Sequence, residues 1–195
     1  MKVKICGLRS LEDAAMCEDL GADALGFIHF HGKKRHLTLG KIAEIGASLG
    51  PMTKKVVVCS PGTVAEAQDI LGRSQADAIQ LYSLSPEELQ ALRESGATVI
   101  RAVKPDRAMA MEYSGCVDAL LFEKGEPGTG SGYDYSKIPM DVGVHKIIGG
   151  GLTPGNLIHA KSLKPYALDV SSGVEGADGR KDPRLVEEFI RRAKS

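Results

Sequence analysis

Short apolar runs recur along the chain, and longer stretches with a helical apolar period lie between them. Each run has the length of a strand that is buried on both faces, as in a parallel sheet. The pattern predicts eight strands, at residues 2–6, 23–29, 54–59, 77–81, 98–103, 117–122, 145–148 and 166–170.

Several of the intervening stretches begin with residues that favour a helix N-terminus. A capping residue is followed either by a glutamate three positions later or directly by a proline, and both patterns mark the first turn of a helix. We therefore expect helices to begin at four such pairs: Thr63 with Glu66, Ser85 with Glu88, Thr153 with Pro154, and Asp182 with Pro183.

Three of the predicted strands open in the same way, with an aspartate between small apolar residues: Asp23, Asp77 and Asp118. Their spacing is uneven, so they do not indicate a strict sequence repeat. We interpret them as one recurring solution to the turn that leads from a helix into a buried strand.

Eight strands that alternate with helices are typical of either a closed barrel or an open doubly wound sheet. The strand count and the even alternation favour an α/β fold of the closed kind, a (β/α)8 TIM barrel. No linker or low-complexity segment interrupts the chain, so we expect residues 1–195 to form a single domain.

The 25 basic and 25 acidic side chains cancel, so no bulk attraction to nucleic acid or to an anionic membrane is expected. No apolar run approaches the ~18 residues of a transmembrane helix, and the N-terminus lacks the apolar core of a signal peptide. We therefore expect a cytoplasmic protein. Its four cysteines have no metal-ligand spacing, so no metal site is predicted and the thiols should be reduced.

Cys6 is the most informative candidate residue. It ends the first predicted strand and is followed by Gly7 and by Ser10, which can cap the next helix. Barrel enzymes hold their catalytic groups at this end of the strands. Cys59 ends another strand and is the rival thiol, whereas Cys17 lies on an apolar helix stripe and is expected in the core.

Two glycine-containing segments follow the last two predicted strands, where barrels often bind phosphate. Glycines allow backbone N–H groups to approach an anion, and a following helix N-terminus adds a favourable dipole. Each segment alone is weak evidence, because such loops also serve simply to turn the chain. Together they predict a phosphate site formed by Gly149, Gly150 and Gly151 and by Ser171, Ser172 and Gly173.

Two charged residues complete the candidate site. Glu123 ends the sixth predicted strand, and Arg35 lies in the loop after the second, where its fork could bind a substrate carboxylate. The glycine-rich stretch that follows Glu123 is either a loose surface connection or a lid over the substrate. A thiol, a carboxylic acid and a phosphate cradle suit proton transfer on a small phosphorylated substrate. Such a base would need a raised thiolate fraction from nearby positive charge.

Motifs along essentially the whole chain resemble those of one enzyme family. They are Lys4–Gly7 (KICG) with Glu12–Ala14 (EDA), Gly21–Phe27 (GADALGF), Gln80–Leu81 (QL), Gly128–Gly130 (GTG) with Tyr133–Asp134 (YD), Gly149–Asn156 (GGGLTPGN), and Asp169–Glu175 (DVSSGVE) with Lys181–Asp182 (KD). The chain thereby resembles phosphoribosylanthranilate isomerase of tryptophan biosynthesis.

The resemblance implies a cofactor-free (β/α)8 enzyme, monomeric or homodimeric, that carries out an Amadori rearrangement of N-(5-phosphoribosyl)anthranilate to 1-(2-carboxyphenylamino)-1-deoxyribulose 5-phosphate. An acid opens the ribose ring to a Schiff base, and a cysteine removes the C2′ proton to give an enolamine that becomes the ketone. By position, Cys6 is the base and Glu123 the acid. Arg35, Gln80 and Asp169 contact the substrate, and the two segments after the last strands bind its phosphate.

The chain departs from the usual family pattern at the general acid. An aspartate is usual where Glu123 stands, and the usual Gln-Leu-His reads Gln80-Leu81-Tyr82. A misplacement of ~1 Å can cost on the order of 100-fold in rate. Two alternatives therefore remain open: a related phosphosugar isomerase, such as that of histidine biosynthesis, and a non-catalytic barrel that binds phosphorylated ligands.

Overall fold

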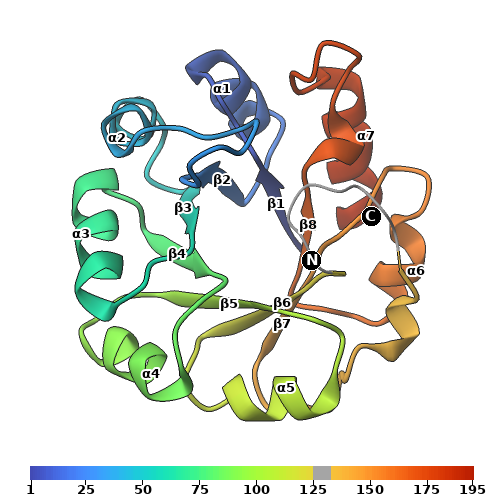
Figure 1. The fold of residues 1–195 in the computed structure, drawn as a ribbon. Coiled ribbons are helices and arrows are strands. Elements are labelled where there is room, and N and C mark those ends of the chain that lie inside the picture. The colour runs from blue at the N-terminus through green and yellow to red at the C-terminus, as the bar shows by residue number, and fades with distance from the viewer. Residues whose placement is uncertain (125–132) are drawn as a thin grey trace.

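Eight parallel strands form a closed barrel in chain order, each strand paired with its neighbours and β8 paired with β1 (Figure 1). The computed structural model describes residues 1–124 and 133–195. The strands are β1 (Lys2–Cys6), β2 (Ala24–Ile28), β3 (Lys54–Cys59), β4 (Ala78–Leu81), β5 (Val99–Val103), β6 (Ala119–Phe122), β7 (His145–Ile148) and β8 (Ala167–Val170). The predicted (β/α)8 barrel is confirmed.

The helices surround the barrel and cover its outer surface (Figure 1). They are α1 (Leu11–Asp19), α2 (Leu39–Ala47), α3 (Val64–Ser74), α4 (Pro86–Glu94), α5 (Arg107–Tyr113), α6 (Leu157–Ser162) and α7 (Pro183–Lys194), with the 3₁₀ turns η1 (Tyr135–Lys137) and η2 (Ser172–Val174). No helix among the described residues is long and apolar enough to span a bilayer.

The three repeated aspartates tie neighbouring strands together at the amino end of the barrel. The Oδ2 atom of Asp23 accepts the N–H of Val3 at 2.9 Å, and that of Asp77 accepts the N–H of Lys55 at 2.7 Å. Asp118 binds Val99 in the same way at 2.8 Å. Each carboxylate therefore satisfies a backbone donor at the start of the preceding strand, which explains why the motif recurs without a fixed spacing.

Most of the predicted helix starts are confirmed. Ser85 and Glu88 form a complete capping box, and the Asp182 side chain caps α7. Thr63 caps α3. The prediction for Thr153 and Pro154 is wrong, because α6 begins only at Leu157.

The reason lies in the Asn156 side chain. Its Oδ1 accepts the Thr153 N–H at 2.8 Å, while Thr153 Oγ1 accepts the Asn156 N–H at 3.3 Å. These two bonds close a separate turn and delay the helix.

The strand register arranges the inward-facing side chains in layers of four, taken from alternate strands. From the amino end upward, the layers are Ala24, Ala78, Ala119 and Ala167; Lys4, Val56, Ile100 and Ile147; Gly26, Gln80, Leu121 and Asp169; Cys6, Val58, Ala102 and Gly149; and Ile28, Tyr82, Glu123 and Ser171. Apart from Lys4, the polar and reactive groups of these layers lie in the upper ones, and the layer of Ala24, Ala78, Ala119 and Ala167 consists of alanine alone.

The alanine layer leaves a cavity of about 420 Å³ at the amino end of the barrel. Its lining combines apolar side chains with charged ones that include Lys4, Asp23 and Asp118. The protein has a small apolar core inside the barrel and a larger one between the barrel and the helices. The larger core includes the fully buried rings of Phe27, Phe122 and Phe189. The outer core therefore supplies most of the buried apolar volume.

We predict that Asp77→Ala lowers the free energy of unfolding by about 1–3 kcal/mol, because a backbone donor of β3 loses a charged acceptor. Asp69→Ala is the control, since Asp69 makes only an exposed i,i+4 pair with Arg73 and should cost less than about 0.5 kcal/mol. Urea unfolding of both variants tests this. Equal costs would contradict the role given to the repeated aspartates.

Candidate active site

Cys6 ends β1 with its side chain inside the barrel and is 6% exposed. The neighbouring position on β2 is Gly26, where an added Cβ would lie 2.8 Å from the Cys6 Sγ atom. A side chain there would displace the thiol. Gly26 therefore provides the space that the thiol occupies, and the predicted placement of Cys6 at the carboxyl end of β1 is confirmed.

A buried ion pair lies beneath the thiol. The Lys4 Nζ atom is 2.7 Å from Asp169 Oδ1, and the two side chains are 3% and 10% exposed. Burial opposes the charge on Lys4, but Asp169 and Cys6 together more than offset this and raise the pKa of Lys4 above its ordinary value. Lys4 and Asp169 both act electrostatically on Cys6 in a region of low dielectric.

The pKa of Cys6 is raised above its ordinary value of 9.0. Burial is the largest cause, and Asp169 adds to it, while Lys4 and Lys181 lower the pKa by less. The expected positive charges are present, but they do not outweigh burial. The raised thiolate fraction that a cysteine base needs is therefore not supplied by these two lysines alone.

Glu123 follows β6, and its side chain belongs to the layer nearest the opening of the barrel. Burial raises the pKa of its carboxyl to about 7, and hydrogen bonding with Tyr82 limits the rise. Asp169 raises this pKa further, and Lys4 lowers it. A carboxyl with this pKa keeps its proton in about half of the molecules at pH 7, far more than an ordinary glutamate, and can therefore serve as a general acid.

Arg35 is positioned by a carboxylate of the chain itself. Its Nε atom donates to Glu175 Oε1 and its Nη2 atom to Glu175 Oε2, each at 2.7 Å. Lys181 Nζ also donates to Glu175 Oε1, at 3.0 Å. Burial alone would raise the pKa of Glu175, but Arg35 and Lys181 lower it below its ordinary value. The guanidinium is thus oriented through Nε and Nη2 beside Gly7, near Cys6.

The two predicted phosphate segments are in direct contact. An added Cβ at Gly173 would lie 1.8 Å from the Leu152 carbonyl oxygen, so only glycine allows the loops after β7 and β8 to meet. Gly150 and Gly151 have φ angles of +77° and +70°, which favour glycine. The Gly149 N–H already donates to the Phe122 carbonyl at 3.0 Å, which leaves Gly150 and Gly151 as the donors of that loop.

The remaining predicted residues lie in the upper layers. Gln80 is 2% exposed, and its Nε2 atom donates to the Tyr82 hydroxyl at 3.2 Å. Ser171 Oγ is buried and has no hydrogen-bond partner among the described residues, and it lies next to Gly7. Ser172 begins the turn η2. The glycine-rich stretch after Glu123, for which a lid was considered, lies largely outside the described residues.

Cys59 is excluded as the reactive thiol. Its side chain is 1% exposed and packs in the outer core, because it is out of phase with the inward-facing Val56 and Val58. Burial raises its pKa to about 12. Cys17 also lies in this core, as predicted.

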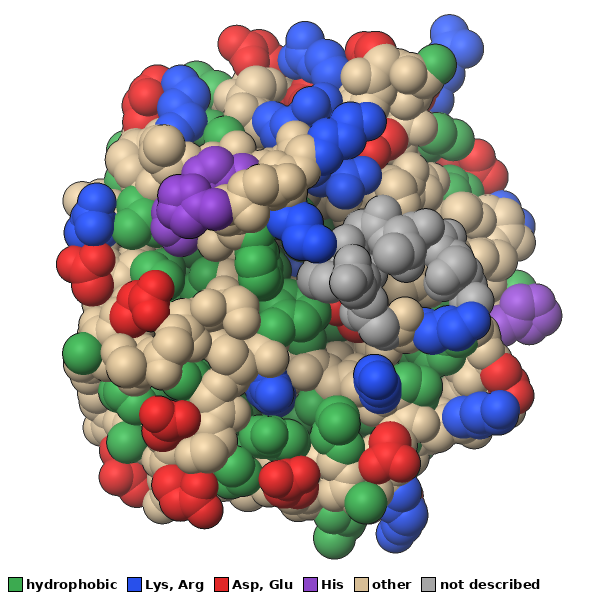
Figure 2. Space-filling view, in the orientation of Figure 1, with side chains coloured by type: hydrophobic (Ala, Val, Ile, Leu, Met, Phe, Trp, Pro, Cys, Tyr) green, Lys and Arg blue, Asp and Glu red, His purple; other side chains and the backbone are tan. Residues whose placement is uncertain are grey.

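The face of the barrel that carries this site has a central hollow with apolar side chains, and lysine and arginine side chains lie around it (Figure 2). A group of histidines lies on the same face (Figure 2). His29, His31 and His36 are in mutual ring contact, with centroids 4.8–5.7 Å apart. No group of residues in the described part of the chain could hold a metal ion.

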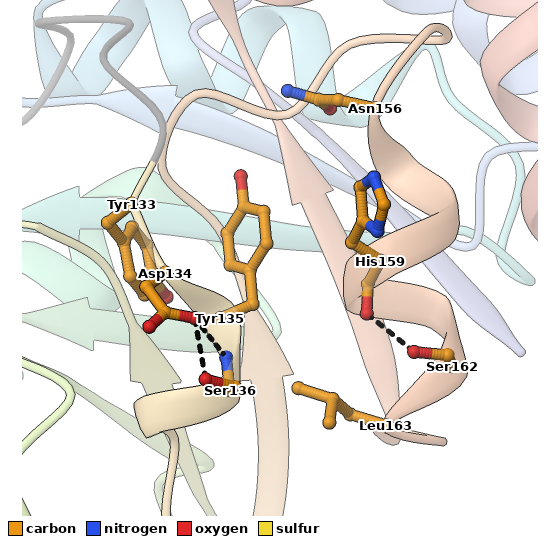
Figure 3. A pocket seen from close by; sticks show the side chains of 8 residues that line it. All are labelled: Tyr133, Asp134, Tyr135, Ser136, Asn156, His159, Ser162 and Leu163. Carbon is orange, nitrogen blue, oxygen red and sulfur yellow. Dashed lines mark hydrogen bonds between the residues drawn. The ribbon is translucent and has the colours of Figure 1, made fainter.

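A second cavity, of about 690 Å³, lies between the segment that contains η1 and helix α6 (Figure 3). Its polar groups mostly bind one another: Asp134 accepts from Ser136, and Ser162 donates to the His159 carbonyl. The Tyr135 hydroxyl donates to the Gly150 carbonyl at 2.9 Å. This contact fixes the orientation of the Gly150 peptide group.

The site contains residues that sequence reasoning did not assign. Lys4 is the clearest case, because a lysine at the centre of a buried strand, in phase with Cys6, is itself unusual. Glu175 and Lys181 were noted as part of a motif but given no role. Glu175 binds Arg35 across 140 positions of the chain, and Lys181 binds Glu175 across 6 positions. Local sequence patterns do not predict these contacts.

A closed barrel with a buried thiol, a carboxyl of raised pKa and glycine-rich segments at one end defines a class: (β/α)8-barrel enzymes that act by proton transfer. Residues 3–192 match the family model for N-(5′-phosphoribosyl)anthranilate isomerase. The chain belongs to this family.

Individual relatives agree with this assignment. An N-(5′-phosphoribosyl)anthranilate isomerase of Methanothrix thermoacetophila is 38% identical over 205 residues, covering 100% of this chain and 98% of the relative. The crystal structure of the Thermotoga maritima phosphoribosylanthranilate isomerase is similar with a TM-score of 0.91 at 33% identity, covering 100% of this chain and 98% of that one. A phosphoribosylanthranilate isomerase in complex with reduced 1-(o-carboxyphenylamino)-1-deoxyribulose 5-phosphate has a TM-score of 0.88 at 31% identity, with the same coverage.

We predict that Lys4→Met lowers the free energy of unfolding by about 3–5 kcal/mol, because it leaves the Asp169 charge buried without its partner. Adding Asp169→Asn removes that charge and should recover part of the loss. Urea unfolding of the two single variants and the double variant measures the coupling. Strictly additive losses would contradict a direct interaction between the two charges.

Proposed function

We propose that this chain isomerises N-(5′-phosphoribosyl)anthranilate by general acid–base catalysis, with Cys6 as the base and Glu123 as the acid. The observation that carries the proposal is the placement of the two groups in adjacent upper layers of one barrel. Asp169 acts electrostatically on both of them. The complex of a relative with a reduced product supports the same type of substrate for this chain.

The reaction begins at Glu123, which donates its proton to the ribose ring oxygen. The ring C–O bond breaks, and the nitrogen lone pair forms the C=N bond of a Schiff base. Cys6, as the thiolate, then removes the C2′ proton, and the electron pair moves to give an enolamine. Tautomerisation of the enolamine to the ketone completes the rearrangement, with no net gain or loss of electrons.

The ends of the substrate are held by two separate groups of donors. Arg35 faces the substrate carboxylate, with Glu175 holding its guanidinium in place. The phosphate is bound by the backbone N–H groups of Gly150 and Gly151 and by Ser171, Ser172 and Gly173, where two loops converge. The N–H of Gly149, which was also predicted to bind it, is already bonded to Phe122. Gln80 and Asp169 line the space between these ends. The monomeric or homodimeric state predicted from the sequence stays a prediction.

The two catalytic groups titrate in an unusual order. The acid has a pKa of about 7, and burial raises the pKa of the base above its ordinary value, so the productive form, with Glu123 protonated and Cys6 ionised, is the minor tautomer. Only a small fraction of the molecules holds it. Substrate binding that brings positive charge closer to Cys6 would increase this fraction.

We predict that Cys6→Ala lowers kcat by at least about 100-fold without changing the fold, since proton abstraction by a side chain contributes on the order of 10²–10⁴. Cys59→Ala is the matched control, because Cys59 also ends a strand but packs against the helices. The loss of substrate fluorescence measures turnover. A Cys6→Ala protein with near wild-type kcat would contradict the role of Cys6, whereas ligand binding without turnover by the wild-type protein would favour a non-catalytic barrel.

We predict that kcat/KM rises with pH up to about 7, stays level, and falls above the pKa of Cys6. Below 7 the thiolate fraction grows while Glu123 stays protonated. Between the two pKa values the gain in thiolate cancels the loss of acid, and above both only the loss remains. The substrate phosphate also ionises, near pH 6. The variant Glu123→Asp therefore serves to assign the acidic limb of the profile, which is the rise below pH 7. A limb that stays in place in this variant would not belong to Glu123.

A further inference from the structure

The segment after the turn η2 folds back on itself and brings Glu175 and Lys181 together. The two residues pair in an antiparallel bridge, and the Asp182 N–H donates to the Val174 carbonyl at 3.0 Å. Lys181 Nζ donates to Glu175 Oε1, also at 3.0 Å. Backbone and side-chain bonds therefore hold the two charged residues as one unit.

Lys181 joins this unit to the segment that was assigned to phosphate. Its Nζ atom also donates to the Ser171 carbonyl at 3.0 Å, and its side chain is 1% exposed. An ammonium group can donate in several directions at once, and a buried bond to it is costly to lose. Ser171 is the residue whose buried hydroxyl has no partner in the described part of the chain. The lysine thus fixes the backbone of a residue that is proposed to bind phosphate.

Glu175 joins the same unit to Arg35. Its two oxygens accept from Nε and Nη2 of the arginine, each at 2.7 Å, and both side chains are largely buried. A bidentate pair of this kind fixes the plane of the guanidinium as well as its position. The Nη1 atom donates to none of the described residues, so it remains available for a ligand carboxylate.

Arg35 and Ser171 also meet at Gly7, the residue that follows Cys6. An added Cβ at Gly7 would lie 2.6 Å from Arg35 Cδ and 2.9 Å from Ser171 Oγ. A side chain at this position would therefore displace the arginine, the serine or both. The groups proposed for the two ends of the substrate thus form one connected cluster, with Lys181 and Glu175 as the link between them.

We propose that Glu175, anchored by Lys181, is a positioning residue that holds Arg35 at a fixed place relative to the phosphate segment, and that the site thereby selects ligands with a carboxylate as well as a phosphate. The proposal deepens the proposed function and rests on it, because Arg35 is taken to face the substrate carboxylate. The physical reason is pre-organisation. An arginine that is already fixed loses little conformational freedom when a ligand binds, whereas a free one must first be immobilised.

The test compares two ligands that differ only in the carboxylate. They are reduced 1-(o-carboxyphenylamino)-1-deoxyribulose 5-phosphate and the corresponding phenylamino compound, and calorimetry gives the Kd of each. The wild-type protein should prefer the carboxylated compound by about 10- to 100-fold, the range for hydrogen bonds between charged groups. Glu175→Asp keeps every charge but shortens the side chain, so it should lower this preference by about 3- to 10-fold. Its affinity for the phenylamino compound should change little.

Lys181→Met provides a second variant, because it removes the anchor of Glu175 without removing the contact with Arg35. It should also lower the preference for the carboxylated compound. Lys34→Met is the matched control, since Lys34 is exposed in the same loop as Arg35, and it should leave the preference unchanged. In an Arg35→Met protein, adding Glu175→Asp should cause no further loss of preference, because the arginine through which Glu175 acts is gone.

The proposal is overturned by a wild-type protein without this preference, by an unchanged preference in both variants, or by an equal weakening of both ligands, which would indicate a general loosening of the site. The measurement needs no turnover. If the wild-type protein binds with the expected preference but does not isomerise phosphoribosylanthranilate, the proposed function fails and the positioning role stands. Turnover by the wild-type protein, with an unchanged preference in both variants, would mean the reverse.

Discussion

The buried pair of Lys4 and Asp169 is the interaction on which the site depends. It joins the first and last strands of the barrel with a 2.7 Å contact between residues 165 positions apart. It also sets the electrostatic environment of the chemistry, because Lys4 and Asp169 act in opposite directions on both Cys6 and Glu123. A buried pair of this kind adds little net stability, but losing either partner is costly. The pair is therefore better understood as fixing the geometry and charge of the site than as strengthening the fold.

The sequence was sufficient to predict the architecture because strand and helix signals are local. The eight apolar runs and the capping residues are properties of short windows, and all eight strands lie within about two residues of their predicted bounds. The error at Thr153 arose because Asn156 offers the same backbone an alternative set of hydrogen bonds. Thr153 followed by Pro154 has a helix-start pattern, and only the competing turn rules it out.

Predicting the site was harder because its properties depend on burial and on contacts between distant residues. The position of Cys6 followed from its place at a strand end, but its raised pKa reflects a balance between burial and two lysines that a sequence does not reveal. Arg35 was identified as an anion-binding group, whereas its engagement with Glu175 depends on the closed barrel. Tyr82 was noticed only as a departure from a pattern. Its hydrogen bond from Gln80 is formed only in the folded barrel.

The closure of the barrel by its last strand also affects how the protein is made on the ribosome. Cys6 is synthesised well before Asp169, Glu175 and Lys181, which determine its surroundings. A nascent chain that ends before β8 exposes the Lys4 charge and an unpaired edge of β1, an arrangement open to incorrect strand pairing. Catalytic competence therefore arises in one late step, so activity reports on completion of the whole barrel.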